Sequence, residues 1–236
     1  MRKLLVALGV LALAVSAGCL GTGGGPTQQQ LERNATYDWS KDTDVAIDVS
    51  GGQYTLVATV DGQRKVKFSR SGGFGGRNPL RIGAVKFRYP NGTTVGADAI
   101  SVSTRNSRTV VELPAANGTF AYTANAGGRS VTIPVAFDGS HELVLPLGMR
   151  TSFPVFGVVE PAGYSKTIED NRVHVRWESL DGGVIDTKFY LQRDLYLFGG
   201  VAGVLALAAV AGVVYYRLRI RRLEDEREQA GLDVEK

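Results

Sequence analysis

The chain has 236 residues, of which 44% are hydrophobic and 30 are glycine. This apolar content is enough for a packed core and excludes a disordered protein, and the glycines show no three-residue period, which excludes collagen. The single cysteine excludes an intrachain disulfide and a four-cysteine zinc site. Lys and Arg number 27 against 23 Asp and Glu, a balance of +4 that is too small to indicate nucleic acid as a partner. We expect no cofactor.

The first eighteen residues have the three parts of a secretory signal peptide. Arg2 and Lys3 form a charged start, residues 4–15 are an apolar run, and Ser16-Ala17-Gly18 provides the small residues of a cleavage site. A helix of about 12 residues is too short to cross a hydrocarbon core of ~30 Å. We therefore assign residues 1–18 to a signal peptide.

Cys19 follows these small residues directly and is the only cysteine of the chain. Small residues before a cysteine resemble a lipobox, in which the thiol receives a lipid and becomes the first residue of the mature protein. Ser16 stands where an aliphatic residue is usual. The alternative is ordinary cleavage after Ala17, which leaves Cys19 unmodified. We predict lipidation at Cys19, and residues 19–30 then form a flexible tether rich in glycine and glutamine.

A second apolar segment lies near the C-terminus. Residues 195–216 carry no charge, and as a helix they span about 33 Å, enough to cross a bilayer. Few cations precede this segment, whereas five arginines follow it closely, and the positive-inside rule therefore places the C-terminus in the cytoplasm. We predict a single-pass cell-membrane protein with a transmembrane helix over residues 194–217, a cytoplasmic tail over 218–236 and an extracellular domain before the helix.

The predicted helix carries two features that indicate contacts. Gly199 and Gly203 form a GxxxG pattern, in which small residues let two helices approach closely. The basic residues after the span are expected to contact anionic lipid headgroups; they are Arg217, Arg219, Arg221 and Arg222. The lipid bilayer is thus a predicted partner, and the oligomeric state stays open at this stage.

Between the two ends the hydrophobic period changes to two, which predicts half-buried strands. The alternating runs are residues 45–49, 54–60, 66–68, 100–104, 120–122, 131–133, 172–178 and 185–191. About ten to twelve short strands over residues 31–193 predict an all-β domain, an immunoglobulin-like or related β-sandwich. It is either one composite unit or two subdomains divided near Pro114.

Pairs of Asp-Gly or Asn-Gly separate several of these runs and favour tight hairpin turns. They are Asp61-Gly62, Asn91-Gly92, Asn117-Gly118, Asp138-Gly139 and Asp181-Gly182. The last pair lies between runs 172–178 and 185–191, so we expect these two runs to form a hairpin that buries Trp177 and Phe189.

Three Asn-x-Thr sequences in the predicted extracellular domain are acceptors for N-glycosylation. They begin at Asn34, Asn91 and Asn117. Two of them coincide with predicted turns, where a glycan could be accommodated.

Several segments together resemble a known family. They are Ala17-Gly18-Cys19-Leu20-Gly21, Tyr37-Asp38-Trp39, and residues 148–164, 172–178 and 189–200. The chain resembles a haloarchaeal family of exported, membrane-anchored, lipoprotein-like proteins of unknown function over nearly its whole length. These motifs are compositional rather than catalytic, so the resemblance implies a location and no activity, and it transfers no functional residue.

Signals for catalysis or metal binding are weak. The only histidines are His141 and His174, His174 is expected on a solvated strand face, and no HExxH, GxSxG or paired-cysteine pattern occurs. Four carboxylates could gather a calcium ion but lack EF-hand spacing, so we interpret them as a solvated strand edge; they are Asp38, Asp42, Asp44 and Asp48. We predict no catalytic residue, no metal site and no enzyme.

A glycine-rich run, residues 72–76, follows three basic residues and is predicted to be a mobile surface loop. The basic residues are Lys65, Lys67 and Arg70. If this region binds a ligand, an anionic headgroup or glycan suits it.

Three functions are compatible with the sequence. The first is a cell-surface β protein that binds or supports an envelope component, with an envelope protein or a glycan as its partner. The second is an accessory subunit of a membrane transport or secretion complex, which would pack against the glycine-containing face of the helix. The third is an envelope hydrolase that uses His141 or His174.

Overall fold

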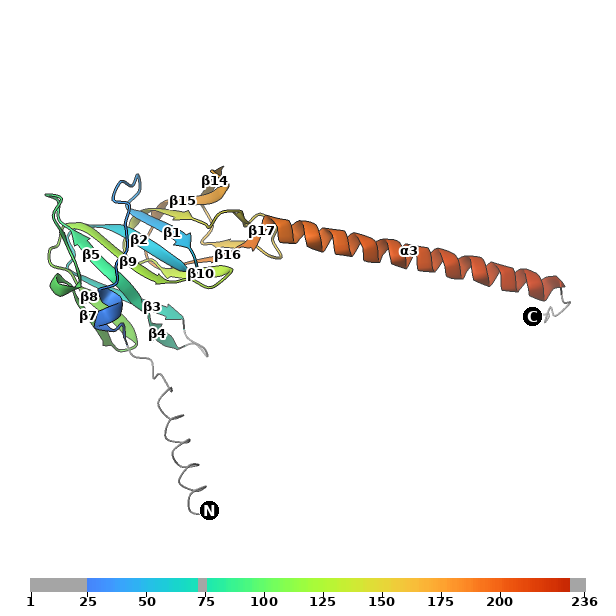
Figure 1. Ribbon diagram of the computed structural model, residues 1–236, viewed down its shortest axis with the longest axis horizontal. Coiled ribbons are helices and arrows are strands. Elements are labelled where there is room, and N and C mark those ends of the chain that lie inside the picture. The colour runs from blue at the N-terminus through green and yellow to red at the C-terminus, as the bar shows by residue number, and fades with distance from the viewer. Residues whose placement is uncertain (1–24, 72–75, 230–236) are drawn as a thin grey trace, which may run out of the picture. The chain divides into compact units, whose positions relative to one another are not determined.

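The computed structural model describes residues 25–71 and 76–229 (Figure 1). The chain divides into a β domain that ends at Phe189 and a second unit that begins at Tyr190. The predicted signal peptide, Cys19 and part of the predicted tether lie outside the described residues.

The described part of the β domain contains a large eight-stranded sheet and two smaller sheets of four and three strands. The large sheet has the strand order β14 (Ser165–Glu169), β15 (Arg172–Leu180), β11 (Gly139–Val144), β1 (Val45–Ser50), β2 (Gln53–Val60), β9 (Gly118–Asn125), β5 (Ile82–Arg88), β6 (Thr94–Val95). The four-stranded sheet has the order β4 (Arg77–Pro79), β3 (Lys65–Ser71), β8 (Arg108–Glu112), β7 (Ser101–Arg105). The three-stranded sheet has the order β10 (Ser130–Pro134), β16 (Val184–Lys188), β13 (Val158–Glu160).

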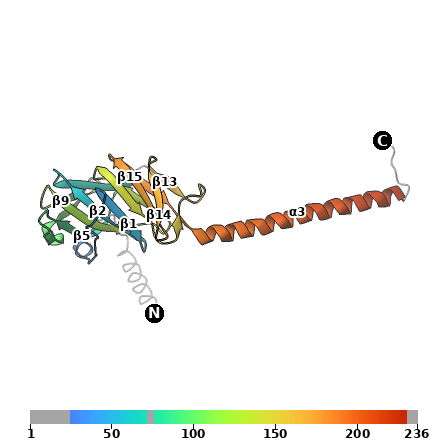
Figure 2. The same ribbon diagram turned by 90° about the horizontal axis from the view of Figure 1, so that it is seen from above.

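Short elements complete the chain. They are α2 (Gln28–Leu31), the 3-10 turn η3 (Ala97–Ala99) and the two-residue strands β12 (Met149–Arg150) and β17 (Tyr190–Leu191). In the large sheet β1 runs parallel to β11, whereas its other described pairs are antiparallel. Figure 2 shows β9, β2, β1 and β15 side by side across this sheet. This mostly antiparallel arrangement is consistent with the expected immunoglobulin-like or related β-sandwich.

One hydrophobic core lies between the large sheet and the two smaller sheets. Phe68 of β3 contacts Tyr122 of β9 with 5.2 Å between ring centroids, and Phe137 lies 6.3 Å from Phe120 of β9. All four rings are buried, and each aromatic side chain removes a large apolar area from water. The same core contains residues on both sides of Pro114, such as Leu113 and Phe120.

The N-terminal segment covers part of the outer face of the large sheet. Tyr37 packs on Val57 of β2 and Ala121 of β9, and its hydroxyl donates to Ala84 O at 2.6 Å. Lys86 Nζ donates to Ala35 O at 2.8 Å. We call residues 25–44 the N-terminal strap. Because the strap covers β5 on one face and the core covers the other, β5 has consecutive buried residues and no two-residue alternation.

The expected hairpin between runs 172–178 and 185–191 is wrong. Within the described chain β15 pairs with β11 and β14, while β16 pairs with β10 and β13. Trp177 and Phe189 are both buried in the common core, but they reach it from opposite layers. Asp181-Gly182 therefore connects two sheets instead of two paired strands, because the strands bury their apolar faces against each other's sheets.

The other turn signals were also poor guides to pairing. Of the five Asp-Gly and Asn-Gly pairs in the described chain, Asn91-Gly92 alone joins two paired strands, β5 and β6. The tight turns of the real hairpins have positive φ at both central residues, in Gly51-Gly52, Asn106-Ser107 and Asp170-Asn171. Such angles suit a type I′ turn, whose twist matches that of the flanking strands.

Helix α3 (Gln192–Gln229) forms most of the second unit (Figure 1). It is long and apolar enough to cross a membrane, and its apolar side chains are exposed, with Leu207 at 73% and Val204 at 67%. The helix does not end at residue 217, where the predicted span ends, but continues through the arginines to Gln229.

Two glycines give a matched test of the fold. Gly118 has φ of 153° and a Cβ there would lie 2.5 Å from Phe87 Cζ, whereas a Cβ at Gly182, with φ of 70°, meets nothing within 4 Å. Gly118→Ala should cost about 3 kcal/mol through overpacking and strain, and lower Tm by roughly 6–12 °C. Gly182→Ala should cost about 1 kcal/mol. Thermal unfolding followed by tryptophan fluorescence checks this, and equal losses would contradict the placement of β9.

Candidate functional site

The four-stranded sheet turns one face to the core and the other to solvent. Val66 and Phe68 of β3 are buried, whereas Lys65 and Lys67, which alternate with them, are exposed. Successive side chains of a strand point to opposite faces. The two lysines therefore lie on the outer face because their apolar neighbours occupy the inner one.

Strand register brings further cations to this face. Lys67 stands opposite Val110 of β8 and Lys65 opposite Glu112, so the residues of β8 on the outer face are Arg108, Val110 and Glu112. Cationic side chains of all four strands surround a cavity of about 500 Å³, which we call the basic groove. It is lined by Lys65, Lys67, Arg77, Arg105, Asn106, Arg108 and Val110.

The basic groove contains a pairing that costs stability. Arg105 of β7 and Arg108 of β8 are directly opposite each other at the end of the β7–β8 hairpin, and like charges in such a pair are destabilising. No lining residue that the structure describes is acidic. An anionic ligand would relieve this repulsion, so the arrangement favours binding of negative charge.

The carboxyl group of Glu112, at the edge of the basic groove, is affected by the positive charge of the groove. Its carboxylate forms an ion pair with Lys65 Nζ at 2.8 Å. The hydrogen bond and the charge of Lys65 lower the pKa of Glu112, and the charges of Arg105 and Arg64 lower it further. Both groups of the ion pair are about half exposed, so the pair itself stabilises the fold little. The excess positive charge stays available to a ligand.

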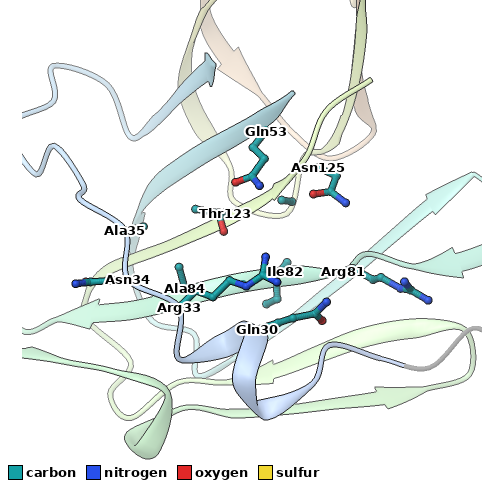
Figure 3. Close-up of a pocket in the computed structure, with 12 residues that line it drawn as sticks. Gln30, Arg33, Asn34, Ala35, Gln53, Arg81, Ile82, Ala84, Thr123 and Asn125 are labelled. Atoms are coloured by element: carbon teal, nitrogen blue, oxygen red, sulfur yellow. The ribbon is translucent and has the colours of Figure 1, made fainter. Parts of the chain in front are cut away.

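A second, polar pocket of about 210 Å³ lies between α2, the N-terminal strap and strands β2, β5 and β9. In Figure 3 the long side chain of Arg33 extends across it, and Thr123 and Gln53 approach from the sheet. Asn34, a predicted glycosylation acceptor, points away from the other labelled side chains. The pocket therefore leaves the Asn34 amide accessible.

The carboxylates considered for calcium do not converge. Asp38, Asp42 and Asp48 line a cavity of about 190 Å³ on the outer face of β1, β2 and β11, but Asp48 accepts two hydrogen bonds from the guanidinium of Arg172, at 2.8 and 3.0 Å. Asp44 instead accepts from Ser140. Among residues 25–71 and 76–229 no three His, Cys, Asp or Glu side chains are placed to hold a metal ion.

The two histidines have separate structural roles. His141 is 2% exposed, its Nδ1 lies 2.9 Å from Gly139 O, and burial lowers its pKa. Its neighbour Ser140 donates its hydroxyl to Asp44 at 2.8 Å. His174, expected on a solvated face, is half-buried and its Nδ1 lies 3.0 Å from Glu142 Oε1. In the described part of the chain, the hydrogen-bond partners of the two rings are Gly139 O and Glu142, and neither ring bonds to a serine hydroxyl.

The predicted glycosylation acceptors all have exposed side chains. Asn91 Oδ1 accepts the backbone N–H of Thr93 at 3.0 Å, which forms a tight turn. Asn117 Oδ1 accepts the backbone N–H of Gly62 at 3.0 Å. Asn34 lies in the N-terminal strap. Their use as acceptors stays a prediction.

The predicted contact residues of the helix lie along α3. A Cβ at Gly199 or Gly203 would meet nothing within 4 Å, so both positions are open for another helix. The predicted headgroup contacts lie on the C-terminal half of the same helix and are exposed; they are Arg217, Arg219, Arg221 and Arg222.

Sequence reasoning found only part of the basic groove. Lys65 and Lys67 were singled out, but Arg70 does not line the groove, and residues 72–75 of the glycine-rich run lie outside the described chain. Arg77, Arg105 and Arg108 were missed. Their signal in the sequence is faint, since only the two arginines that flank Asn106-Ser107 indicate a hairpin with like charges at its end.

These features define a β-sandwich protein with one C-terminal helix apolar enough to cross a membrane and a basic groove on its smaller sheet. A family of unknown function, DUF5803, matches residues 41–235, and the chain belongs to this family. No protein with a curated description matches the sequence. The resemblance to an uncharacterised family is thus confirmed, whereas the haloarchaeal origin and the lipoprotein character stay predictions.

The burial of His141 predicts a pH dependence of stability. Burial lowers the pKa of His141 in the folded state. In the unfolded chain the same imidazole binds a proton below about pH 6.5, whereas in the folded chain it does so only at lower pH. The free energy of unfolding therefore falls as the pH drops below about 6.5. His141→Asn, whose amide can still donate to Gly139 O, should reduce the loss of stability between pH 7.5 and 5.5. Thermal unfolding of the wild type and the variant at a series of pH values measures this loss.

His174→Asn is the matched control, because it leaves His141 in place and should retain the decline. An equal pH dependence in the wild type and in His141→Asn would contradict the assignment.

Proposed function

We propose that this protein is anchored in the cell membrane by α3, and that its β domain lies outside the cell and binds an acidic glycan of the envelope in the basic groove. The observation that carries the proposal is the gathering of five cationic side chains from four strands around one cavity. The protein acts by binding, without catalysis and without a cofactor.

The membrane topology is supported by chemistry at both ends of the chain. The N-terminal residues have the layout of a signal peptide. The side chains of α3 expose an apolar surface that is unfavourable in water and favourable in lipid. The cluster of arginines follows the apolar part of α3, which favours a cytoplasmic C-terminus. A lipid on Cys19 would add a second, weaker anchor.

The shape and charge of the basic groove favour a polymeric anion. Guanidinium groups bind carboxylate and sulfate through paired hydrogen bonds, and ammonium groups add point charges. The cations are spread over the face of a sheet instead of lining a deep cleft, so successive acidic groups of a chain can contact them. Acidic polysaccharide provides this spacing of charge at a cell surface.

Neutralising two cations of the basic groove should weaken binding. We expect Lys67→Gln with Arg108→Gln to reduce affinity for polygalacturonate about tenfold, since each exposed ion pair contributes up to about 1 kcal/mol. The full chain is assayed in nanodiscs of zwitterionic lipid at low salt. Dissociation constants are compared with those for uncharged dextran.

The matched control is Arg33→Gln with Arg176→Gln, which removes two exposed cations elsewhere on the β domain. An equal loss of affinity in both double variants would show that binding depends on net charge alone, and it would contradict a site in the basic groove. Binding to vesicles of anionic lipid, but not to polygalacturonate, would contradict the glycan and indicate a lipid headgroup as the ligand.

The topology has its own test. The full-length protein should stay in the membrane fraction after an alkaline carbonate wash, because the exposed apolar surface of α3 requires lipid. Protease added to intact cells should remove the β domain and spare an epitope placed after Gln229. Release by carbonate would contradict the span, and protection of the β domain would contradict its orientation.

A further inference from the structure

A short loop between β12 and β13 exposes apolar side chains at one end of the β domain. The exposed fractions are 37% for Phe153, 75% for Val155 and 39% for Phe156. The rings of Phe153 and Phe156 stack with centroids 5.6 Å apart and planes at 29°. We call residues 151–157 the aromatic loop. Aromatic and aliphatic side chains presented together in this way mark a surface that another apolar phase covers.

The aromatic loop has a defined backbone. The N–H groups of Phe156 and Gly157 both donate to Phe153 O, at 3.0 and 2.8 Å. A Cβ at Gly157 would collide with the backbone of Thr151, so only glycine permits this close return of the chain. The loop therefore presents Phe153 and Val155 on a compact turn, and little conformational entropy is lost when they are buried.

Strand register places the aromatic loop at the exit of the chain from the domain. Val158, the first residue of β13 after the loop, pairs with Lys188 of β16. The β domain ends at the next residue, Phe189, and α3 begins at Gln192. Two intervening residues, fully extended, reach only about 7 Å. The end of the domain that carries the loop is therefore tied to the start of the apolar helix.

Basic side chains accompany the loop. Lys166 of β14 donates to Ser152 Oγ at 3.1 Å, and Lys188 is exposed in the register position opposite Val158. An apolar tip beside basic groups matches the outer part of a bilayer, where acyl chains lie below phosphate groups.

We propose that the aromatic loop inserts Phe153 and Val155 into the interfacial layer of the outer leaflet and thereby holds the β domain against the membrane. The inference rests on the proposed passage of α3 through the bilayer. In this proposal lipid covers the apolar side chains of the loop, and Lys166 and Lys188 contact the phosphate groups.

Fluorescence quenching in proteoliposomes tests the insertion. The full chain carries Cys19→Ser together with Val155→Cys, Asn106→Cys or Leu207→Cys, and the new thiol is labelled with an environment-sensitive dye. Asn106 is an exposed control on the β7–β8 turn, and Leu207 reports the span itself. Nitroxide-labelled lipids should quench the dye at 155 about twofold or more above the dye at 106, as expected of a group in the headgroup region.

The outcomes separate the two proposals. Equal weak quenching at 155 and 106, with strong quenching at 207, would overturn the insertion and leave the span intact. Loss of quenching at 207 would overturn the span and the insertion together. A dye at 155 that is shielded from water in native envelope vesicles but not quenched by nitroxide lipid would identify a protein partner and also overturn the proposal.

A second measurement uses variants without labels. Phe153→Ser with Val155→Ser should raise the rate of tryptic cleavage at Lys188 and Arg193 in proteoliposomes several-fold, because the domain then moves away from the surface more often. Val184→Ser, at an apolar residue of β16 that is 43% exposed, is the control. Unchanged cleavage in the loop variant, with its β domain folded by tryptophan fluorescence, would contradict the insertion.

Discussion

The contact of Phe68 with Tyr122 across the two layers is the interaction on which the rest of the β domain depends. The chain has one cysteine and so has no intrachain disulfide to hold the layers together. Apolar burial has to supply the stability instead. Every second residue of β3 is buried in this core, so the lysines between these residues point to solvent. The basic groove therefore follows from the same alternation that builds the sandwich.

Two surface features of the domain lower the stability of the isolated fold. Arg105 and Arg108 face each other at the end of a hairpin, and Val155 stands 75% exposed on a compact turn. Each arrangement costs free energy in an isolated domain. Local conflicts of this kind occur where a sequence is adapted to a ligand or a surface, and the two conflicts have opposite chemistry, one cationic and one apolar.

Sequence patterns predicted the strands whose two faces differ and missed those whose faces are alike. Residues 45–49 and 54–60 alternate because one face meets the core, and both form strands. Residues 82–88 do not alternate, because the N-terminal strap covers the second face of β5. The pairing of β15 and β16 with other strands, and the meeting of four strands in the basic groove, depend on contacts distant in sequence, which no local period records.

Salt separates the two proposed contacts. At 1 M ionic strength the Debye length is about 3 Å, so long-range attraction between the basic groove and a polyanion is lost, while direct guanidinium–carboxylate contacts persist. Burial of the aromatic loop in lipid does not weaken with salt and is strengthened by salts that are excluded from apolar surface. At high salt, the aromatic loop and α3 would therefore hold the domain at the membrane, and the arginines of the basic groove would contribute more to ligand affinity than its lysines.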